Sequence, residues 1–361
     1  MRLSSLVTRL LVAALALTVA GCARDRGRPP EEGAITLTGA GASFPYPLYS
    51  RWFDEYDRVE PQVRINYQSI GSGGGIQQLK ANTVDFGASD APLSDKEAEA
   101  MPSPVVHIPI VAGAVVVAYN LPGIERPLRL SADTLAGTYL GDIKRWNDRR
   151  LASVNPGAML PDLSITVAHR SDGSGTTNIF TEYLSTVSTT WAQRVGAGKS
   201  VDWPTGVGGK GNEGVTGLVR NTPGAIGYVE LAYAIQNNLS RVHLRNAAGN
   251  FVDPTLSSTT AAAAGAVETM KRRNDARVSI VNSPDPAAYP IAGFTYILVY
   301  REQPDQAKGE ALARFLDWAI HDGQEFAESL HYARLPEELV TINEAAVRSL
   351  EYEGRSLLGD R

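Results

Sequence analysis

The sequence predicts an α/β protein with two lobes, and three observations support this fold class. The chain has 361 residues, which is enough for two lobes with separate cores. Short strand-like runs are repeatedly followed by a glycine-rich turn and a helical pattern, the order that is typical of a parallel sheet covered by helices. Two long apolar runs, one early and one late, have the length of strands that cross between lobes.

The composition is that of a soluble globular protein, with 43% hydrophobic and 20% charged residues. The formal net charge of −5 gives no indication of nucleic-acid binding. A protein with this charge that binds an anion must attract the anion through groups in the binding site itself, and not through a long-range field. Cys22 is the single cysteine, which excludes an intramolecular disulfide and a cysteine-based metal site. The five histidines lack metal-ligand spacing, so we expect neither a metal nor another cofactor.

The N-terminus indicates an exported lipoprotein. A positively charged start leads into an apolar run that is too short for an ordinary membrane helix. The run ends in the sequence VAGC at residues 19–22, which resembles a bacterial lipobox, although a plain secretory signal beside a chance cysteine would look similar. We expect residues 1–21 to be a signal peptide and Cys22 to carry lipid. Residues 22–34 are charged and show no periodicity, so they are expected to form a tether.

Strands and helices alternate along the next part of the chain. Strands are expected at residues 35–38, 63–67 and 84–89, and helices after Pro47 and near residue 76. These strands lead into Ser43, Ser72 and Asp90. Because the carboxyl ends of parallel strands meet at one edge of a sheet, we expect these three side chains to lie together at a ligand site.

The two long apolar runs set the predicted domain boundaries. Each contains a glycine, Gly113 in the run from 105 to 117 and Gly293 in the run from 289 to 300. Glycines at these places are suited to the bends of two crossover strands. The predicted parts are lobe one, made of residues 35–112 and 294–361, and the crossovers with an inserted lobe two, made of residues 113–293.

Residues 170–177, of sequence RSDGSGTT, are the most informative stretch of the inserted lobe. A strand pattern precedes the stretch, and a helix pattern follows it from Asn178. Backbone N–H groups at a helix start have no partner inside the helix, and the helix dipole favours an anion there. Ser174 and Thr176 add hydroxyl donors, and Arg170 adds a charged fork of donors. The stretch therefore predicts an oxyanion site, and a turn that only caps the helix is the alternative.

A second glycine-rich segment, residues 206–212, does not form a nucleotide-binding phosphate loop. Pro204 stands where such a loop requires its first glycine, and Gly211 stands where serine or threonine must bind magnesium. We interpret the segment as a loop near the ligand cleft. The remaining expected elements are a strand at residues 225–229 and helices at residues 131–140, after residue 308 and at residues 339–350.

The residues around this stretch give little support to catalysis. Ser174 and His169 are close in sequence, but the Gly-x-Ser-x-Gly pattern of a nucleophile elbow is absent. Asp90 and Asp172 are too few carboxylates for a magnesium-dependent phosphotransferase. We therefore expect a site that binds an oxyanion without breaking it and not an enzyme, with a secreted phosphatase acting on phosphate esters as the alternative.

Five segments of the chain resemble the phosphate-binding proteins of the bacterial phosphate-specific ABC transporters. These segments are residues 38–45 (TGAGASFP), 82–94 (NTVDFGASDAPLS), 170–176 (RSDGSGT), 208–212 (GGKGN) and 224–230 (GAIGYVE). The resemblance runs over nearly the whole mature chain, and motifs of this length are highly specific. It implies a type II periplasmic-binding-protein fold with two lobes, each a mixed sheet flanked by helices, which close on one phosphate ion. It also implies a monomer that delivers phosphate to a membrane permease.

The resemblance further implies ligand roles at matching positions. The implied phosphate ligands are Ser43, the backbone of Phe44, Ser72, Asp90, Arg170, Ser174, Gly175 and Thr176, with Asp172 paired to Arg170. Ser43 stands where the family often has threonine, and Gly73 where many members have serine, and neither departure is expected to prevent binding. The expected location is the periplasm or the outer face of the cell membrane.

Asp90 is the acidic residue whose presence in an anion site needs a physical reason. A carboxylate beside an anion is repulsive unless it accepts a hydrogen bond. Phosphate near neutral pH still has a proton to donate and sulfate does not, so Asp90 is predicted to select phosphate. Sulfate or molybdate binding is the alternative specificity, and the acceptor at Asp90 argues against it.

Overall fold

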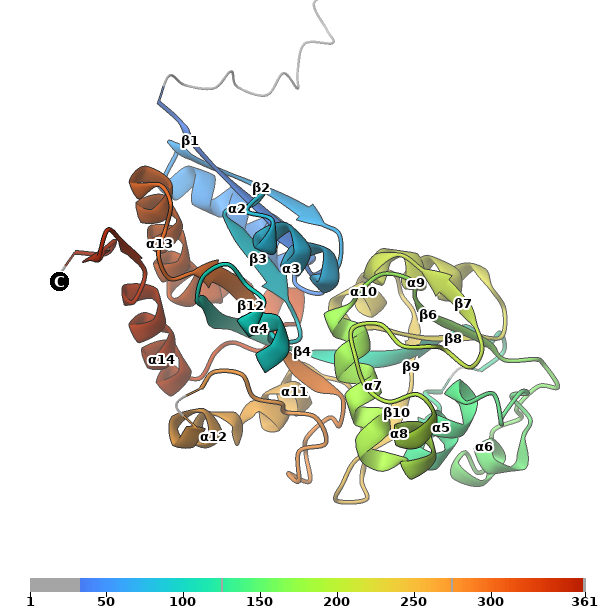
Figure 1. Cartoon of the computed structure of the whole chain (residues 1–361). Helices are drawn as coiled ribbons and strands as arrows, with labels where there is room; N and C mark the ends of the chain where they lie inside the picture. Colours follow the sequence, from blue (N-terminus) through green and yellow to red (C-terminus); the bar gives the residue numbers. More distant parts are fainter. Residues whose placement is uncertain (1–32, 125, 274, 360–361) are drawn as a thin grey trace, which may run out of the picture. The chain divides into compact units, whose positions relative to one another are not determined.

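The computed structural model describes residues 33–124, 126–273 and 275–359. The predicted signal peptide, Cys22 and nearly all of the predicted tether lie outside the described residues. Residues 35–361 form one unit by the contacts between them, and this unit holds the whole sheet that is described below (Figure 1). No helix in the described part of the chain combines the length and the apolar character needed to cross a membrane.

A nine-stranded mixed sheet organises this unit. Its order is β2-β1-β3-β12-β4-β8-β6-β7, and β9 also pairs with β4. Its strands are β1 (Ile35–Gly41), β2 (Val63–Ser69), β3 (Phe86–Ser89), β4 (Val105–Tyr119), β6 (Thr166–Arg170), β7 (Val207–Gly209), β8 (Ala225–Glu230), β9 (Ser240–Arg241) and β12 (Ala292–Tyr300). Smaller sheets are made by β5 (Arg129–Leu130), β10 (His243–Arg245) and β11 (Phe251–Val252), and by β13 (Glu351–Tyr352) and β14 (Arg355–Ser356).

The 15-residue strand β4 connects the two halves of this sheet. Residues 105–114 of β4 pair with β12, and residues 115–119 pair with β8, both antiparallel. The strands β1, β2 and β3 are parallel to one another in one half, and β6, β7 and β8 are parallel in the other half (Figure 1). The predicted long early strand is therefore present, and it belongs to both halves.

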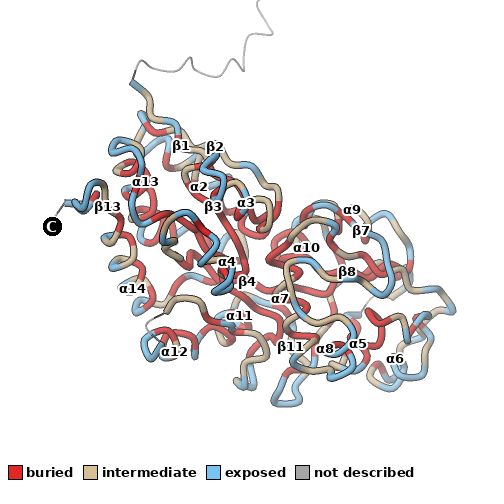
Figure 2. The backbone as a smooth tube through the Cα atoms, in the orientation of Figure 1, coloured by how far each residue is buried: buried red, intermediate tan, exposed pale blue. Residues whose placement is uncertain are grey.

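Helices cover the faces of the sheet. They are α2 (Tyr46–Val59), α3 (Ser72–Lys80), α4 (Asp95–Glu99), α5 (Ala132–Tyr139), α6 (Arg149–Val154), α7 (Gly175–Val187), α8 (Thr189–Arg194), α9 (Gly211–Asn221), α10 (Leu231–Gln236), α11 (Leu256–Ala263), α12 (Ala266–Arg273), α13 (Gln306–Ile320) and α14 (Glu337–Arg348), with short 3₁₀ turns η1 (Asp322–Phe326) and η2 (Glu328–Leu330). Figure 2 shows that burial is concentrated along the strands and on the helix faces that meet them. This is the pattern expected for amphipathic helices on a buried sheet.

Aromatic side chains fill two separate places in this core. On one side α2 and α13 bring together Trp52, Tyr56 and Trp318, with ring centroids 5.3–6.3 Å apart. On the other side Phe180 of α7 stacks on Tyr228 of β8 with centroids 4.3 Å apart. Such ring pairs contribute about 0.5–1.5 kcal/mol each beyond the area that they bury. Each half of the sheet thus has its own aromatic cluster.

Two helices begin earlier than the sequence pattern predicts, and one predicted loop is wrong. The helix α3 begins at Ser72, four residues before the expected start, and α7 begins at Gly175, three residues before it. The predicted loop at residues 206–212 instead holds the strand β7 and the first turn of α9. The physical reason is close packing, because a side chain on Gly209 would overlap the backbone of Gly214. The glycines therefore serve a strand–turn–helix junction and not an irregular loop.

The two glycines of the predicted crossovers face each other. Gly113 of β4 pairs with Gly293 of β12 in the antiparallel ladder. A side chain on Gly113 would overlap the ring of Phe44, and a side chain on Gly293 would overlap Ile179 of α7. Packing therefore favours glycine at both positions, and backbone conformation does not, because neither residue has a positive φ.

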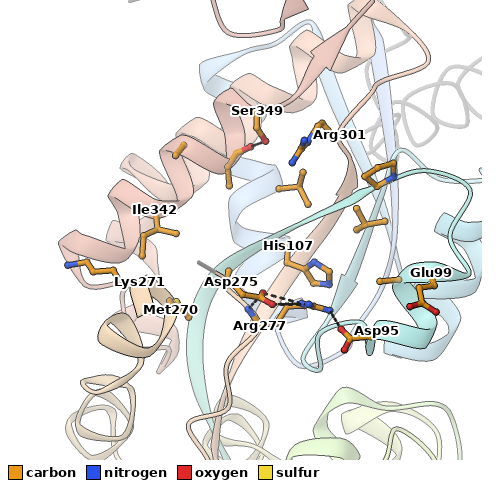
Figure 3. A pocket seen from close by; sticks show the side chains of 17 residues that line it. Asp95, Glu99, His107, Met270, Lys271, Asp275, Arg277, Arg301, Ile342 and Ser349 are labelled. Atoms are coloured by element: carbon orange, nitrogen blue, oxygen red, sulfur yellow. Dashed lines mark hydrogen bonds and ion pairs between the residues drawn. The ribbon is translucent and has the colours of Figure 1, made fainter. Parts of the chain in front are cut away.

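The helices α11 and α12 lie beside elements of predicted lobe one. The helix α11 contacts both β4 and β12. Met270 of α12 lines a pocket together with Ile342 of α14 (Figure 3). The prediction assigned residues 256–273 to the inserted lobe. These contacts favour a division in which the chain returns to the first lobe before α11, and the division itself stays a prediction.

Candidate functional site

The predicted site residues lie at the ends of four strands and come together in one buried place. Ser43 and Phe44 follow β1, Ser72 opens α3, and Asp90 follows β3. Arg170 ends β6, while Ser174, Gly175 and Thr176 form the N-cap and first turn of α7. All of these residues are buried, with Asp90 and Arg170 only 3% and 4% exposed.

The starts of α3 and α7 approach each other closely. The Ser72 hydroxyl oxygen accepts hydrogen bonds from the N–H of Gly175 at 3.0 Å and from the N–H of Asp90 at 3.3 Å. The N–H of Gly73 donates to the carbonyl of Gly173 at 2.9 Å. A Cβ at Gly175 would lie 2.6 Å from the Ser72 oxygen, so this position accommodates only glycine.

Ser43 is positioned by a residue that the sequence analysis did not single out. Its hydroxyl oxygen accepts from the backbone N–H of Asn212 at 3.1 Å and from the Asn212 side-chain amide at 3.0 Å. Because both contacts use the oxygen as acceptor, the Ser43 proton remains available as a donor. The Asn212 side-chain oxygen accepts from the N–H of Glu230 at 2.9 Å, which fixes the orientation of its amide. The GGKGN segment contained this signal, but interpreting it as a loop obscured it.

Arg170 carries the positive charge of the site. Its Nε and Nη2 donate to the two carboxylate oxygens of Asp172 at 2.7 and 2.6 Å, so the predicted pair is present. Asp172 also accepts from the N–H of Gly211 at 3.1 Å. Burial alone would lower the pKa of Arg170, but the bonds to Asp172 more than offset burial and raise it. Burial likewise favours neutral Asp172, yet Arg170 lowers the pKa of this carboxyl. Both groups are therefore charged at neutral pH.

Asp90 lies at the other end of the site among hydroxyl groups. One carboxylate oxygen accepts from the Thr295 hydroxyl at 2.9 Å, and the other accepts from the Thr176 hydroxyl at 3.3 Å. Burial raises the pKa of Asp90 to about 7, although the bond from Thr295 and the charge of Arg170 act in the opposite direction. Asp90 thus holds or lacks a proton near neutral pH. Thr295 was missed because it lies within an apolar strand pattern.

The arrangement of Ser174 and His169 does not form a nucleophile–base pair. The Ser174 hydroxyl oxygen accepts from the N–H of Thr177 at 3.0 Å and so caps α7. The His169 ring stacks on Trp203 with centroids 4.8 Å apart, and its Nδ1 lies 3.0 Å from the carbonyl of Arg170. The described residues also contain no group of three His, Cys, Asp or Glu side chains that could hold a metal ion.

The geometry therefore provides many donors and one carboxyl of adjustable charge. The hydroxyl protons of Ser43 and Ser72, the positive end of the α7 dipole and the Arg170 guanidinium are suited to an oxyanion. The Asp90 carboxylate can accept a hydrogen bond from the anion when it is ionised, and the neutral Asp90 carboxyl can donate one to the anion. Chemically, the site is suited to hold an oxyanion that shares one proton with the protein.

A separate pocket of about 920 Å³ lies away from these residues, between α4, β4, α12 and α14 (Figure 3). Its wall includes His107, whose Nε2 accepts from the N–H of Leu93 at 3.1 Å. Burial lowers the pKa of His107 to about 4, so this ring is neutral at pH 7. Arg277 donates to Asp275 and Asp95 in the same pocket (Figure 3). The charged groups of Arg277, Asp275 and Asp95 are therefore paired with one another. None of the predicted ligand residues lines this pocket.

Comparisons with known proteins support one family. A family model described as "PBP superfamily domain" matches residues 27–322. The chain is 48% identical over 313 residues to the phosphate-binding protein PstS of Xylella fastidiosa (strain 9a5c), covering 86% of this chain and 85% of that protein. It is 37% identical over 379 residues to the phosphate-binding protein PstS of Methanocaldococcus jannaschii, covering 97% and 96% of the two chains.

Solved structures show the same fold at lower identity. A phosphate-binding protein from Stenotrophomonas maltophilia matches with a TM-score of 0.67 at 20% identity, covering 86% of this chain and 94% of that one. A high-affinity periplasmic phosphate-binding protein solved with bound phosphate matches with a TM-score of 0.68 at 22% identity, covering 86% and 93%. These matches confirm the predicted α/β fold of periplasmic binding proteins.

Proposed function

The chain belongs to the PstS family of phosphate-binding proteins, within the PBP superfamily, and from this premise we propose that it binds inorganic phosphate and delivers it to an ABC-type phosphate permease. One observation carries the proposal. The charged Arg170–Asp172 pair and the Asp90 carboxyl, with its pKa of about 7, border the same buried set of donors. An oxyanion that still carries a proton can accept hydrogen bonds from Arg170 at one end of such a site and donate its proton to Asp90 at the other end.

The ligand roles follow from the contacts already described. Arg170 supplies charge, and its guanidinium is held in one orientation by Asp172. The proposed phosphate ligands are Ser43, the Phe44 backbone, Ser72, Asp90, Arg170, Ser174, Gly175 and Thr176. Asn212 and Thr295 position Ser43 and Asp90. The hydroxyls of Ser72 and Ser174 accept backbone N–H bonds, so their protons are free to donate.

We further propose that two lobes close on the ion around the paired glycines Gly113 and Gly293. The proposed ligands come from segments on both sides of β4, and only a closed form lets one small ion contact all of them. Small-angle scattering of the phosphate-free protein should show compaction when phosphate is added. An identical scattering profile at saturating phosphate would contradict closure.

The proposed location is outside the cytoplasmic membrane. The N-terminal apolar run supports export, and the VAGC sequence supports a lipid on Cys22 that anchors the protein. Detergent phase partitioning compares the wild type with Cys22→Ala. Wild type in the detergent phase and Cys22→Ala in the aqueous phase is the expected result. Equal release of both proteins into the aqueous phase would refute the anchor.

Isothermal titration tests the central proposal. Phosphate and arsenate should bind to the phosphate-free protein, and sulfate should bind far more weakly. Incubation with a phosphate ester tests the phosphatase alternative, which the named relatives do not support. Phosphate binding without release of phosphate from the ester is the expected pair of results. Ester turnover would favour the alternative, and absence of phosphate binding would overturn the proposal.

A further inference from the structure

The segment from Asp90 to Glu97 is held by hydrogen bonds on two sides. Glu97 lies in the first turn of α4, and its carboxylate accepts from the backbone N–H of Ser94 at 2.9 Å, while the Ser94 hydroxyl caps the N–H of Glu97. On the far side, the His107 ring accepts from the N–H of Leu93 at 3.1 Å, and Arg277 donates to the Leu93 carbonyl at 3.2 Å. These contacts link Glu97 to the short segment of chain that follows Asp90.

Lys199 connects this segment to the start of α7. Its Nζ donates to both carboxylate oxygens of Glu97, at 3.0 and 2.8 Å, although the two residues are 102 positions apart in sequence. Its carbonyl accepts from the N–H of Ser174 at 2.8 Å, the residue that caps α7. One residue thus holds the proposed phosphate-binding turn with its backbone and the Asp90 segment with its side chain.

The ion pair is more sheltered than most surface pairs. The Lys199 side chain is 16% exposed and the Glu97 side chain is 36% exposed. Burial alone would raise the pKa of Glu97, but the bonds from Lys199 and Ser94 lower it, so the carboxylate stays charged. Lys199 contacts both oxygens of one carboxylate. This distinguishes the pair from exposed ion pairs with a single contact, which contribute little to stability.

From these contacts we infer that the Lys199–Glu97 ion pair is a latch that holds the two sides of the site together and sets the rate at which a bound anion is released. The inference rests on the proposed function. Both residues are positioning residues, because neither is among the proposed phosphate ligands. A contact that forms only after the site closes affects dissociation much more than association.

Lys199→Met and Glu97→Gln both break the latch, but they change the net charge near the site in opposite directions. Lys199→Met removes a positive charge near an anion site, and Glu97→Gln removes a negative one. Long-range attraction alone would make the first variant bind phosphate more weakly and the second more tightly. The latch makes both variants release phosphate faster. Glutamine at position 97 can still accept from the N–H of Ser94, so the cap of α4 is kept.

The measurement is the release of radiolabelled inorganic phosphate into an excess of unlabelled phosphate, followed by quenched flow. Titration gives the dissociation constant, and the two together give the association rate. We expect each single variant to release phosphate about five- to tenfold faster, with association changed by less than about threefold. The double variant should release phosphate no faster than either single variant, because only one interaction is lost.

Lys308→Met is the matched control. Lys308 also contacts both oxygens of a carboxylate, that of Asp85, at 3.0 and 3.2 Å, but it lies in α13 away from the site. Its removal should leave phosphate release unchanged. Thermal unfolding of every phosphate-free variant identifies any general loss of folding, and Glu97→Gln keeps the inference testable if Lys199→Met does not fold.

Three results would overturn the latch. These are unchanged release in both single variants, opposite shifts in the two variants, or additive effects in the double variant. Normal phosphate binding by the wild type together with any of them would overturn the latch alone. Absence of phosphate binding by the wild type would overturn the proposed function and the latch with it.

Discussion

The Asp90 end and the Arg170 end of the site each contain a sheltered carboxyl group, but the two groups are held in opposite states. Asp90 accepts from two threonine hydroxyls, and burial raises its pKa to about 7. Asp172 accepts two bonds from Arg170 and one from a backbone N–H, and its pKa is lowered. Neutral donors do not offset the loss of hydration at Asp90, whereas a paired guanidinium does so at Asp172.

In the proposed phosphate site, this difference gives the two ends different roles. We expect the fixed charge of the Arg170 end to attract any oxyanion of suitable size. The Asp90 end carries a proton that can be gained or lost, and it responds to whether the anion brings a proton of its own. Affinity and selectivity are therefore expected to depend on different ends of the site.

The largest expected effect is at the fixed-charge end. Arg170→Ala should weaken both phosphate and sulfate by about 100-fold or more, because it removes charge-assisted hydrogen bonds and leaves Asp172 unpaired beside the anion. Titration calorimetry measures both constants. Arg145→Ala is the control, since Arg145 forms an exposed ion pair with Asp162 away from the site. A loss below tenfold for Arg170→Ala would break the assignment of affinity to this end.

Stability should depend on pH in opposite ways at the two ends. Asp90 keeps its proton up to about pH 7 in the folded protein but loses it near pH 4 when unfolded, so its contribution to the free energy of unfolding should fall as pH rises between these values. The shift corresponds to about 4 kcal/mol at most. Asp172 acts in the other direction, because its lowered pKa makes the folded protein lose stability below about pH 4. The buried His107, whose pKa is lowered to about 4, also contributes in the direction opposite to Asp90.

Urea unfolding of the phosphate-free protein between pH 4 and 8 measures this slope. The slope of Asp90→Asn should be more positive than that of the wild type, and the difference between the two slopes measures the contribution of Asp90. The buried carboxyl of Glu230 also has a raised pKa, caused by burial, and contributes in the same direction. Glu230→Gln is therefore compared in parallel to separate the two groups. Identical slopes in wild type and Asp90→Asn would show that Asp90 is not the group that titrates.

A smaller effect is expected on selectivity. At pH 8.5, above the pKa of Asp90, the amide of Asp90→Asn adds a donor for sulfate that the ionised carboxylate lacks. The ratio of the sulfate to the phosphate dissociation constant should therefore fall by about one to two decades. Phosphate loses one charge-assisted bond but gains from reduced repulsion. Arg170→Ala, measured alongside, should weaken both anions together and leave the ratio unchanged. An unchanged ratio in Asp90→Asn would disprove selection through the shared proton.

The smallest effect is expected from Thr295→Val, which keeps the shape of the side chain and removes the donor to Asp90. The pKa of Asp90 should rise further, and the affinity for phosphate should change by less than about tenfold, as for a single hydrogen bond. The pH midpoint of the stability curve reports the pKa. Thr138→Val is the control, since Thr138 is equally buried but donates only to the backbone of its own helix. A midpoint unchanged from the wild type would show that Thr295 does not tune Asp90.

The positions of most residues in the candidate site could be predicted because these residues follow local signals, while their ligand roles stay predictions. Strand alternation and glycine-rich turns identify where β1, β3 and β6 end, and Ser43, Asp90 and Arg170 lie at those ends. Thr295 gives no such signal. It lies in an apolar run, and its bond to Asp90, 205 residues away, follows from the pairing of Tyr296 with Ser89. Contacts of this kind depend on strand register and cannot be read from periodicity.

The other misses come from glycine. Glycine lowers helix propensity, so the sequence pattern placed the start of α7 after Gly175 and left residues 206–212 without regular structure. In the folded chain the cap from Ser174 starts α7 early. Gly209 and Gly214 are needed because their backbones touch. The same residue type that indicates a loop in sequence can allow two elements to pack without space for a side chain.

The pairing of Gly113 with Gly293 has a mechanical consequence. The ring of Phe44 rests on the bare backbone of β4 and the side chain of Ile179 rests on that of β12, at the same level of the ladder. Two adjacent strands that each carry a packed side chain at the same level are expected to bend together. In the proposed closure, we therefore expect a change of strand curvature at this level to move the turn after β1 and the first turns of α7 together, which would couple ligand capture to the bending of two strands.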